Sequence, residues 1–140
     1  MLFPKKVKFR KWQTARRNPL KRGRPETRGV NVSFGSFGLK AVSPNRITSN
    51  QIEAARKVAN RAMGKTGKLW IRIFPDRPFT AKAAEVGMGK GKGDLKGYHV
   101  EVRPGRVLFE IDGTTEEMAR EALRKAGAKL PLKTKIIMRQ

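Results

Sequence analysis

Residues 48–64 read TSNQIEAARKVANRAMG and predict an amphipathic helix. Thr48 stands at the expected N-cap, and Gln51 follows three residues later, which is the spacing of a capping box. Gly64 or Gly67 is expected to end the helix. Apolar residues recur at helical spacing and are interpreted as core, with no cofactor role: Ile52, Ala55, Val58, Ala59, Ala62 and Met63.

A second helix is predicted over residues 114–126. Thr114 is its expected N-cap, Glu117 completes a capping box, and Gly127 is expected to end the helix. The predicted core positions of this helix are Met118, Ala119, Ala122, Leu123 and Ala126.

Two stretches favour β-strands in different surroundings. Residues 30–34 alternate between apolar and polar side chains, as in a half-buried strand, and Gly35 and Gly38 then suggest a bulge or a close backbone approach. Residues 68–74, KLWIRIF, are apolar on both faces, which favours a central strand. Arg72 in that setting needs a partner, either a carboxylate or a phosphate.

Residues 98–103 and 106–111 favour a β-hairpin around the dipeptide Pro104-Gly105. This dipeptide favours a type II turn, whose twist suits a tight hairpin poorly, so a longer loop is the alternative. Together these elements predict an α+β fold in which two helices pack on a mixed or antiparallel sheet. We expect residues 29–140 to form this fold as a single domain.

The charge of the chain limits its partners. Its 140 residues include 33 Lys and Arg against 11 Asp and Glu, a net charge of +22. Because such self-repulsion destabilises a compact state, we expect a polyanionic partner, with nucleic acid first and an acidic membrane surface second. With no cysteine and one histidine, neither a cofactor nor a metal site is expected, and no enzyme activity. A carboxylate pair such as Asp76 and Asp94 has no further support as a catalytic site.

Residues 1–28 are predicted to form a basic N-terminal arm, because they hold 11 basic residues and one acid, Glu26. Prolines break any long helix, and the arm has too little apolar surface to fold alone. We expect it to be disordered in solution and to become ordered on RNA. Arginine there could hold phosphates with paired hydrogen bonds. For Trp12, stacking on a base and packing onto the body are equal alternatives.

Residues 86–97, VGMGKGKGDLKG, predict a loop between strands. From Gly89 to Gly93 the glycines alternate with lysine, which places positive charge beside an adaptable backbone and suits RNA phosphates. A flexible loop in solvent with no ligand is the alternative. A P-loop is excluded because no Ser or Thr follows Lys90 or Lys92, and the glycine spacing does not match a dinucleotide-binding fingerprint.

Eight blocks of the chain together resemble the bacterial large-subunit ribosomal protein L-sixteen family, in the family's order and over nearly the whole length. They are MLFPKKVKFRK, VSFGSFGLKA, QIEAAR, GKLWIRIFPDRP, MGKGKG, PGRVLFEIDG, EEMAREALR and KLPLKTK. The resemblance implies a compact α/β-hammerhead-like fold with an extended basic arm. It also implies binding to large-subunit rRNA near the A-site tRNA and the peptidyl-transferase centre, and a role in late subunit assembly.

The expected site residues follow from the resemblance and from the arm. The predicted rRNA contacts are Lys5, Lys6, Lys8, Arg10, Lys11, Trp12, Arg16, Arg17 and Arg72, of which the resemblance supplies the first five. The predicted loop near rRNA and tRNA comprises Met88, Gly89, Lys90, Gly91, Lys92 and Gly93. Two departures from the family stand out: Gly87 replaces a common arginine, and residues 18–29 align poorly.

The expected partners are large-subunit rRNA, A-site tRNA with P-site tRNA as an alternative, and other large-subunit proteins, without DNA or a membrane. The expected location is the cytoplasmic ribosome of a bacterium, with an organellar ribosome as the weaker alternative. A free DNA-binding protein is the second hypothesis, because charge alone would allow it. The absence of any sign of dimer symmetry speaks against that hypothesis.

Overall fold

The computed structural model describes residues 1–14 and 18–140, which form two helices and two antiparallel sheets. The helices are α1 (Ser49–Met63) and α2 (Glu116–Ala128). A four-stranded sheet has the order β3 (Lys68–Ile71), β6 (Val107–Asp112), β1 (Phe37–Ala41) and β7 (Thr134–Met138). A three-stranded sheet has the order β2 (Asn45–Thr48), β5 (Asp94–Val102) and β4 (Arg77–Ala81).

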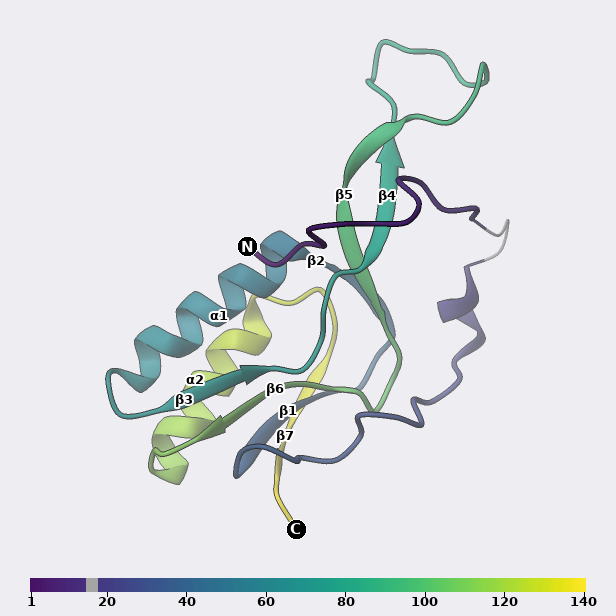
Figure 1. Cartoon of the computed structure of the whole chain (residues 1–140). Helices are drawn as coiled ribbons and strands as arrows, with labels where there is room; N and C mark the ends of the chain where they lie inside the picture. The colour runs from purple at the N-terminus through teal and green to yellow at the C-terminus, as the bar shows by residue number, and fades with distance from the viewer. Residues whose placement is uncertain (15–17) are drawn as a thin grey trace.

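The two helices lie side by side against the four-stranded sheet, while β4 and β5 extend away from this body as a long hairpin (Figure 1). The core between helices and sheet is apolar and includes Leu39, Phe109 and Ile111, all at most 1% exposed. Every strand pairing in the described ranges is antiparallel, so the predicted α+β class is confirmed. No helix in this part of the chain has the length and apolar character needed to cross a bilayer.

The first helix forms as its sequence predicts. Thr48 is the N-cap of α1, and both hydrogen bonds of the capping box with Gln51 are present. The helix ends at Met63, and Gly64 caps it with a φ of +70°, a conformation that favours glycine. Because these signals are local, they determine the helix without reference to the rest of the fold.

The second helix begins one residue later than predicted. Thr115 is the N-cap of α2 and accepts a hydrogen bond from the Met118 N–H, so no capping box with Glu117 forms. Met118, predicted as core, is 38% exposed. Gly127, which was expected to end the helix, lies inside it. A Cβ at this position would approach Oγ1 of Thr134 to 2.6 Å. This glycine allows β7 to pass close to the helix.

The predicted hairpin of residues 98–103 and 106–111 is wrong. β5 pairs with β2 and β4, whereas β6 pairs with β3 and β1, so the two segments belong to different sheets. The turn between them has the expected geometry, because Arg106 N–H donates to the Arg103 carbonyl and Gly105 has a φ of +100°. A type II turn does not match the twist of a tight hairpin, and here it carries the chain from one sheet to the next.

The strand predictions at residues 30–34 and 68–74 also need correction. β3 pairs only with β6 and is therefore an edge strand, not a central one. Its second apolar face is covered by residues 30–36, which form no strand but cross the sheet. The predicted close backbone approach is confirmed at Gly35, where an added Cβ would lie 2.6 Å from the Ile111 carbonyl oxygen. At Gly38 the close neighbour is instead a side chain, because an added Cβ would lie 2.8 Å from Cγ2 of Val32.

The described residues of the predicted arm lie along the body. Leu2 packs beside the core, and its carbonyl accepts a hydrogen bond from the Ser49 hydroxyl at the start of α1. The arm then crosses the β4–β5 hairpin (Figure 1). A short 3₁₀ helix, η1 (Pro19–Arg22), follows, and Leu20 within it is 6% exposed. The division into an arm and one domain, and the disorder of the arm in solution, stay predictions.

Candidate RNA-binding surface

The β4–β5 hairpin positions the glycine- and lysine-rich loop at its tip (Figure 1). The loop runs over residues 82–93 and not 86–97, because Asp94–Gly97 belong to β5 and pair with β4. Glycine is required where the loop joins the hairpin: a Cβ at Gly93 would lie 2.7 Å from the Ala81 carbonyl oxygen. The loop therefore protrudes from the end of the paired strands β4 and β5 (Figure 1).

Three successive residues at the loop tip have positive φ angles: Gly89 at +99°, Lys90 at +59° and Gly91 at +100°. Lysine rarely adopts this conformation, whereas the glycines on either side do so easily. Lys82 reaches across the loop and donates a hydrogen bond to the Gly89 carbonyl. Met88 is 98% exposed, so the tip presents its side chains to solvent.

One hydrogen bond joins the arm to the loop: the Lys92 ammonium group donates to the Trp12 carbonyl. Trp12 is 42% exposed and Phe9 is 63% exposed, so both retain open ring surface beside the lysines. Lys8 lies over the Phe9 ring at 5.5 Å. Aromatic rings interleaved with cations can bind single-stranded RNA by stacking and charge together. The RNA contacts of Trp12 stay a prediction.

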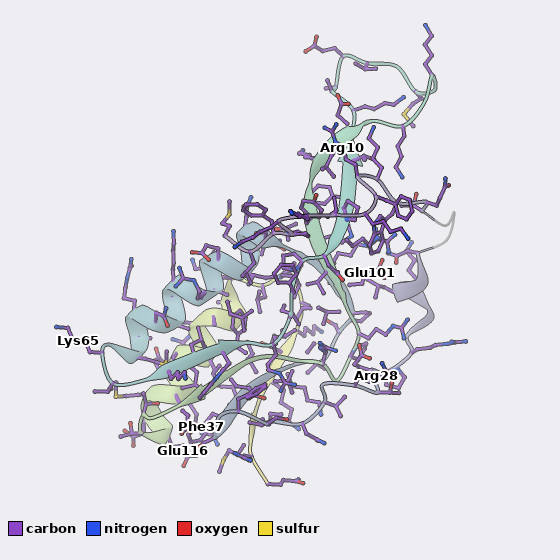
Figure 2. All side chains as sticks on the ribbon, in the orientation of Figure 1. Arg10, Arg28, Phe37, Lys65, Glu101 and Glu116 are labelled. Atoms are coloured by element: carbon purple, nitrogen blue, oxygen red, sulfur yellow. The ribbon has the colours of Figure 1, made fainter. Side chains whose placement is uncertain are left out.

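The predicted arm cations are mostly open to solvent. Lys5, Lys6, Lys8 and Arg10 are exposed, and Lys11 is half-buried. Arg16 and Arg17 lie outside the described residues. In the loop, Lys90 and Lys92 are exposed. Figure 2 shows Arg10 beside the hairpin, far from Lys65 at the opposite end of the molecule.

Ion pairs in the described ranges concentrate on the helices and between strands. On α1 Arg56 pairs with Glu53, and on α2 Arg120 pairs with Glu116 while Arg124 and Lys125 pair with Glu121. None of these pairs involves a described lysine or arginine of the arm or a lysine of the loop. The described cations of the arm and the loop are therefore not neutralised by acids of the described residues, as is also true of other cations on the body, such as Lys57 and Arg61.

Arg72 has a carboxylate partner inside the protein. Glu110 is fully buried and accepts hydrogen bonds from Arg72 at 2.5 Å and from the backbone N–H groups of Ser33, Phe34 and Gly35 at 2.6–3.0 Å. Burial alone would raise the pKa of Glu110, but these four donors hold it below its ordinary value. Of the two partners expected for Arg72, the structure provides the carboxylate, and an additional phosphate contact stays a prediction.

A second, half-buried cluster supports the base of the hairpin. Glu101 on β5 accepts hydrogen bonds from Arg46 on β2 and Arg77 on β4, which ties the three strands together. His99 is 7% exposed and stacks on Phe79 with ring centroids 5.2 Å apart. Burial lowers the pKa of His99. Arg46 and Arg77 lower it further, against the opposite effect of Glu101 and Asp76.

Sequence reasoning missed Glu110, Arg46 and Arg77 as organising residues. For Glu110 a signal was available, because a lone carboxylate in the apolar run RVLFEI is the natural partner for the lone arginine in LWIRIF. For Arg46 and Arg77 there was none, since their meeting at Glu101 depends on how three strands pair. The described residues hold no cluster of His, Cys, Asp and Glu that could bind a metal.

A small α+β body with unpaired cations on an arm and a protruding loop is typical of structural proteins that bind RNA. Comparison with known sequences agrees. The family model of ribosomal protein L16p/L10e matches residues 4–137. The large ribosomal subunit protein uL16 of Chelativorans sp. (strain BNC1) is 52% identical over 139 residues, which cover 99% of this chain and 98% of that protein. The chain belongs to the ribosomal protein L16p/L10e family, whose members are structural proteins and not enzymes.

Proposed function

We propose that this protein is a structural component of the large ribosomal subunit that binds large-subunit rRNA beside the A-site tRNA and the peptidyl-transferase centre. Family membership supports its place on the cytoplasmic ribosome and its contact with rRNA and other ribosomal proteins. The finer assignment, to tRNA placement and late assembly, rests on the family resemblance and on the exposed loop at residues 82–93.

The observation that carries the proposal is the joining of arm and loop through Lys92 and Trp12. It gathers cations from two distant parts of the sequence on one side of the molecule. Phosphate neutralisation there supplies most of the affinity, so binding weakens steeply as salt rises. The shape of the RNA supplies the specificity, with the folded body of the protein inserted as a wedge between RNA helices.

Sedimentation tests the subunit assignment. Tagged protein from a growing-cell lysate is expected in the large-subunit fraction of a sucrose gradient and is expected to leave that fraction after RNase treatment. Protein that sediments with DNA, or remains free at the top of the gradient, would contradict the assignment and favour the DNA-binding alternative.

The double change Lys90→Ala and Lys92→Ala tests the loop. We expect the isolated protein to fold normally, because both side chains are exposed, while subunit maturation or A-site tRNA binding is impaired. Lys57→Ala with Arg61→Ala on α1 removes the same charge from another surface and serves as the control. Normal assembly and tRNA binding with the loop variant would show that the loop is a solvated connection with no ligand.

A further inference from the structure

A ladder of aromatic rings and cations lies on β3, apart from the arm and the loop. Phe34 stacks on Trp70 with centroids 6.3 Å apart and an interplanar angle of 21°. The Arg72 guanidinium lies over the Phe34 ring at 4.9 Å, and the Lys68 ammonium group lies over the Trp70 ring at 5.1 Å. Even with these neighbours Phe34 remains 55% exposed. An aromatic ring that is positioned by such contacts and is still more than half exposed suggests a binding surface.

The ladder is fixed in place by the buried Glu110 carboxylate. Glu110 accepts the Phe34 N–H at 2.6 Å and the Arg72 guanidinium at 2.5 Å, so one group orients both the ring and the cation above it. Arg72 also donates to the Asn31 carbonyl at 3.3 Å. The stack therefore exists before any partner arrives, which reduces the ordering cost of binding.

Part of the ladder lines a surface hollow that contains both cations and acids. Trp70, Arg72 and Phe74 line one surface hollow together with Arg106, whose guanidinium donates to the carbonyls of Arg72 and Arg28. Glu26, Asp76 and Glu101 also line this hollow, and of these Glu101 is paired with Arg46 and Arg77. Glu110 is buried in its own hydrogen bonds, and Asp112 accepts hydrogen bonds from the Ser36 hydroxyl and the Gly113 N–H. The exposed rings suit a ligand with flat faces, and Lys68 and Arg106, which appear in no ion pair of the described ranges, suit a ligand with negative charge.

We propose that the Phe34–Trp70 ladder is a second RNA-binding site, which stacks an unpaired nucleobase on the open surface of Phe34. Arg72 and Arg106 lie where they can hold the phosphates on either side of that base. Stacking accepts any base, because every base has a flat π-face, so this site reads the presence of an unpaired nucleotide and not its sequence. The inference rests on the proposed function, since the base belongs to rRNA.

The ladder and the loop lie at opposite ends of the molecule, because β3 borders the helical body and the loop caps the hairpin (Figure 1). An RNA that fills both sites is therefore contacted at two separate segments. The protein would then hold two segments of the rRNA at a fixed distance from each other. The arm and the loop would bind one segment, and the ladder would bind the other.

Photo-crosslinking of the full chain tests the site. The protein is mixed with a twelve-nucleotide oligouridylate, irradiated at short wavelength and digested with nuclease and trypsin. Mass spectrometry is expected to find uridine adducts on Phe34, in the peptide of residues 29–40, or on Trp70, in the peptide of residues 69–72. Adducts confined to the arm and loop would overturn the ladder site while leaving the proposed function intact. Absence of any RNA binding would overturn both.

Substitutions at Phe34 separate stacking from packing. Phe34→Trp should keep the adduct yield in these peptides, whereas Phe34→Leu and Phe34→Ala should lower it about fivefold or more. Adducts in the arm serve as the internal standard, and circular dichroism checks that each variant folds. Equal yields for the Trp and Leu variants would show that Phe34 only packs. Burial of Phe34 in intact subunits without a nucleotide adduct would show that a protein covers the ladder, which also overturns the proposal.

Discussion

Glu110 shows how one buried side chain can connect three segments of a chain. Its carboxylate accepts hydrogen bonds from the N–H groups of residues 33–35 and from the guanidinium of Arg72. A fully buried carboxylate is tolerated here because hydrogen-bond donors surround both of its oxygen atoms. The sequence predicted that Arg72 needed a partner but left carboxylate and phosphate open. Strand pairing determines that the partner is the carboxylate, because it places Trp70 opposite Glu110. Local sequence patterns do not predict which strands pair.

Replacing Glu110 with glutamine is expected to destabilise the fold by about 3 kcal/mol, because Arg72 loses its counter-charge and one amide must serve four donors. Urea unfolding followed by circular dichroism measures the change. Glu117→Gln, on the exposed first turn of α2, is the matched control and should have little effect. A stability of the Glu110→Gln variant equal to that of the parent would show that the buried pair contributes no net stabilisation.

The same carboxylate should make stability depend on pH. Because its pKa in the folded state lies below the ordinary value of 4.5, its stabilisation is complete above pH 4.5 and is lost as the pH falls through the folded-state pKa. The stability difference between the parent and Glu110→Gln is therefore expected to shrink below pH 4.5. Urea unfolding of both proteins at several pH values measures it, and a constant difference would contradict the assignment.

His99 offers a direct probe because it is the only histidine in the chain. Burial and the nearby Arg46 and Arg77 favour its neutral form, so its pKa is expected below the ordinary 6.5. The shift of its ring protons with pH in NMR spectra gives this value without assignment of other residues. In the Glu101→Gln variant the pKa should fall further, because a favourable negative charge is removed. A pKa above 6.5 in the parent would contradict this account.

At the level of elements, the helices were predictable and the strand pairings were not. A cap, a stripe and a terminal glycine all lie within one helix, as at Thr48 and Gly64 of α1. Strand order depends on contacts between distant residues, so the local pattern predicts one hairpin from residues 98–103 and 106–111 although these segments belong to two sheets. The loop was located from its glycines, but its end at Gly93 depends on the pairing of β4 with β5.

The N-cap of α2 can be tested by a pair of substitutions. Thr115→Ala is expected to destabilise the protein by about 1 kcal/mol, because the Met118 N–H loses its acceptor. Thr114→Val should be neutral or stabilising, because the Thr114 hydroxyl is buried without a hydrogen-bond partner. Thermal unfolding of the two variants compares them. A greater loss of stability from Thr114→Val than from Thr115→Ala would show that Thr114, the N-cap expected from the sequence, is the true N-cap.

At the scale of the whole molecule, we expect binding of a polyanionic partner to depend more on where the positive charge lies than on the net charge. The cations of α2 and Arg56 of α1 pair with neighbouring acids, whereas the described arm residues 1–14 hold five cations and no acid. Composition predicted a polyanionic partner but could not say which side would meet it. The fold brings Trp12 and Lys92 together, and that side of the molecule is therefore the RNA-binding surface that we propose.

Replacing Lys5, Lys6 and Lys8 with glutamine is expected to flatten the dependence of RNA affinity on salt. If each lysine neutralises one phosphate, the slope of log K against log salt should fall by about 2 for single-stranded RNA. Lys57, Arg61 and Lys65 provide a control with the same charge change around α1 (Figure 2 labels Lys65). Filter binding at several salt concentrations measures both, and equal slopes for the two triple variants would contradict a directed surface.

The clamp at Glu110 also determines the order in which the protein can fold as it is synthesised. The carboxylate comes 75 to 77 residues after the three amides that it binds. In the same way, β1 can pair with its neighbours only after β6 and β7 have been synthesised. Contacts between such distant residues form late. The basic segment at the start of the chain is therefore made long before the body that will hold it. During that interval the arm is exposed without the body that it later lies along.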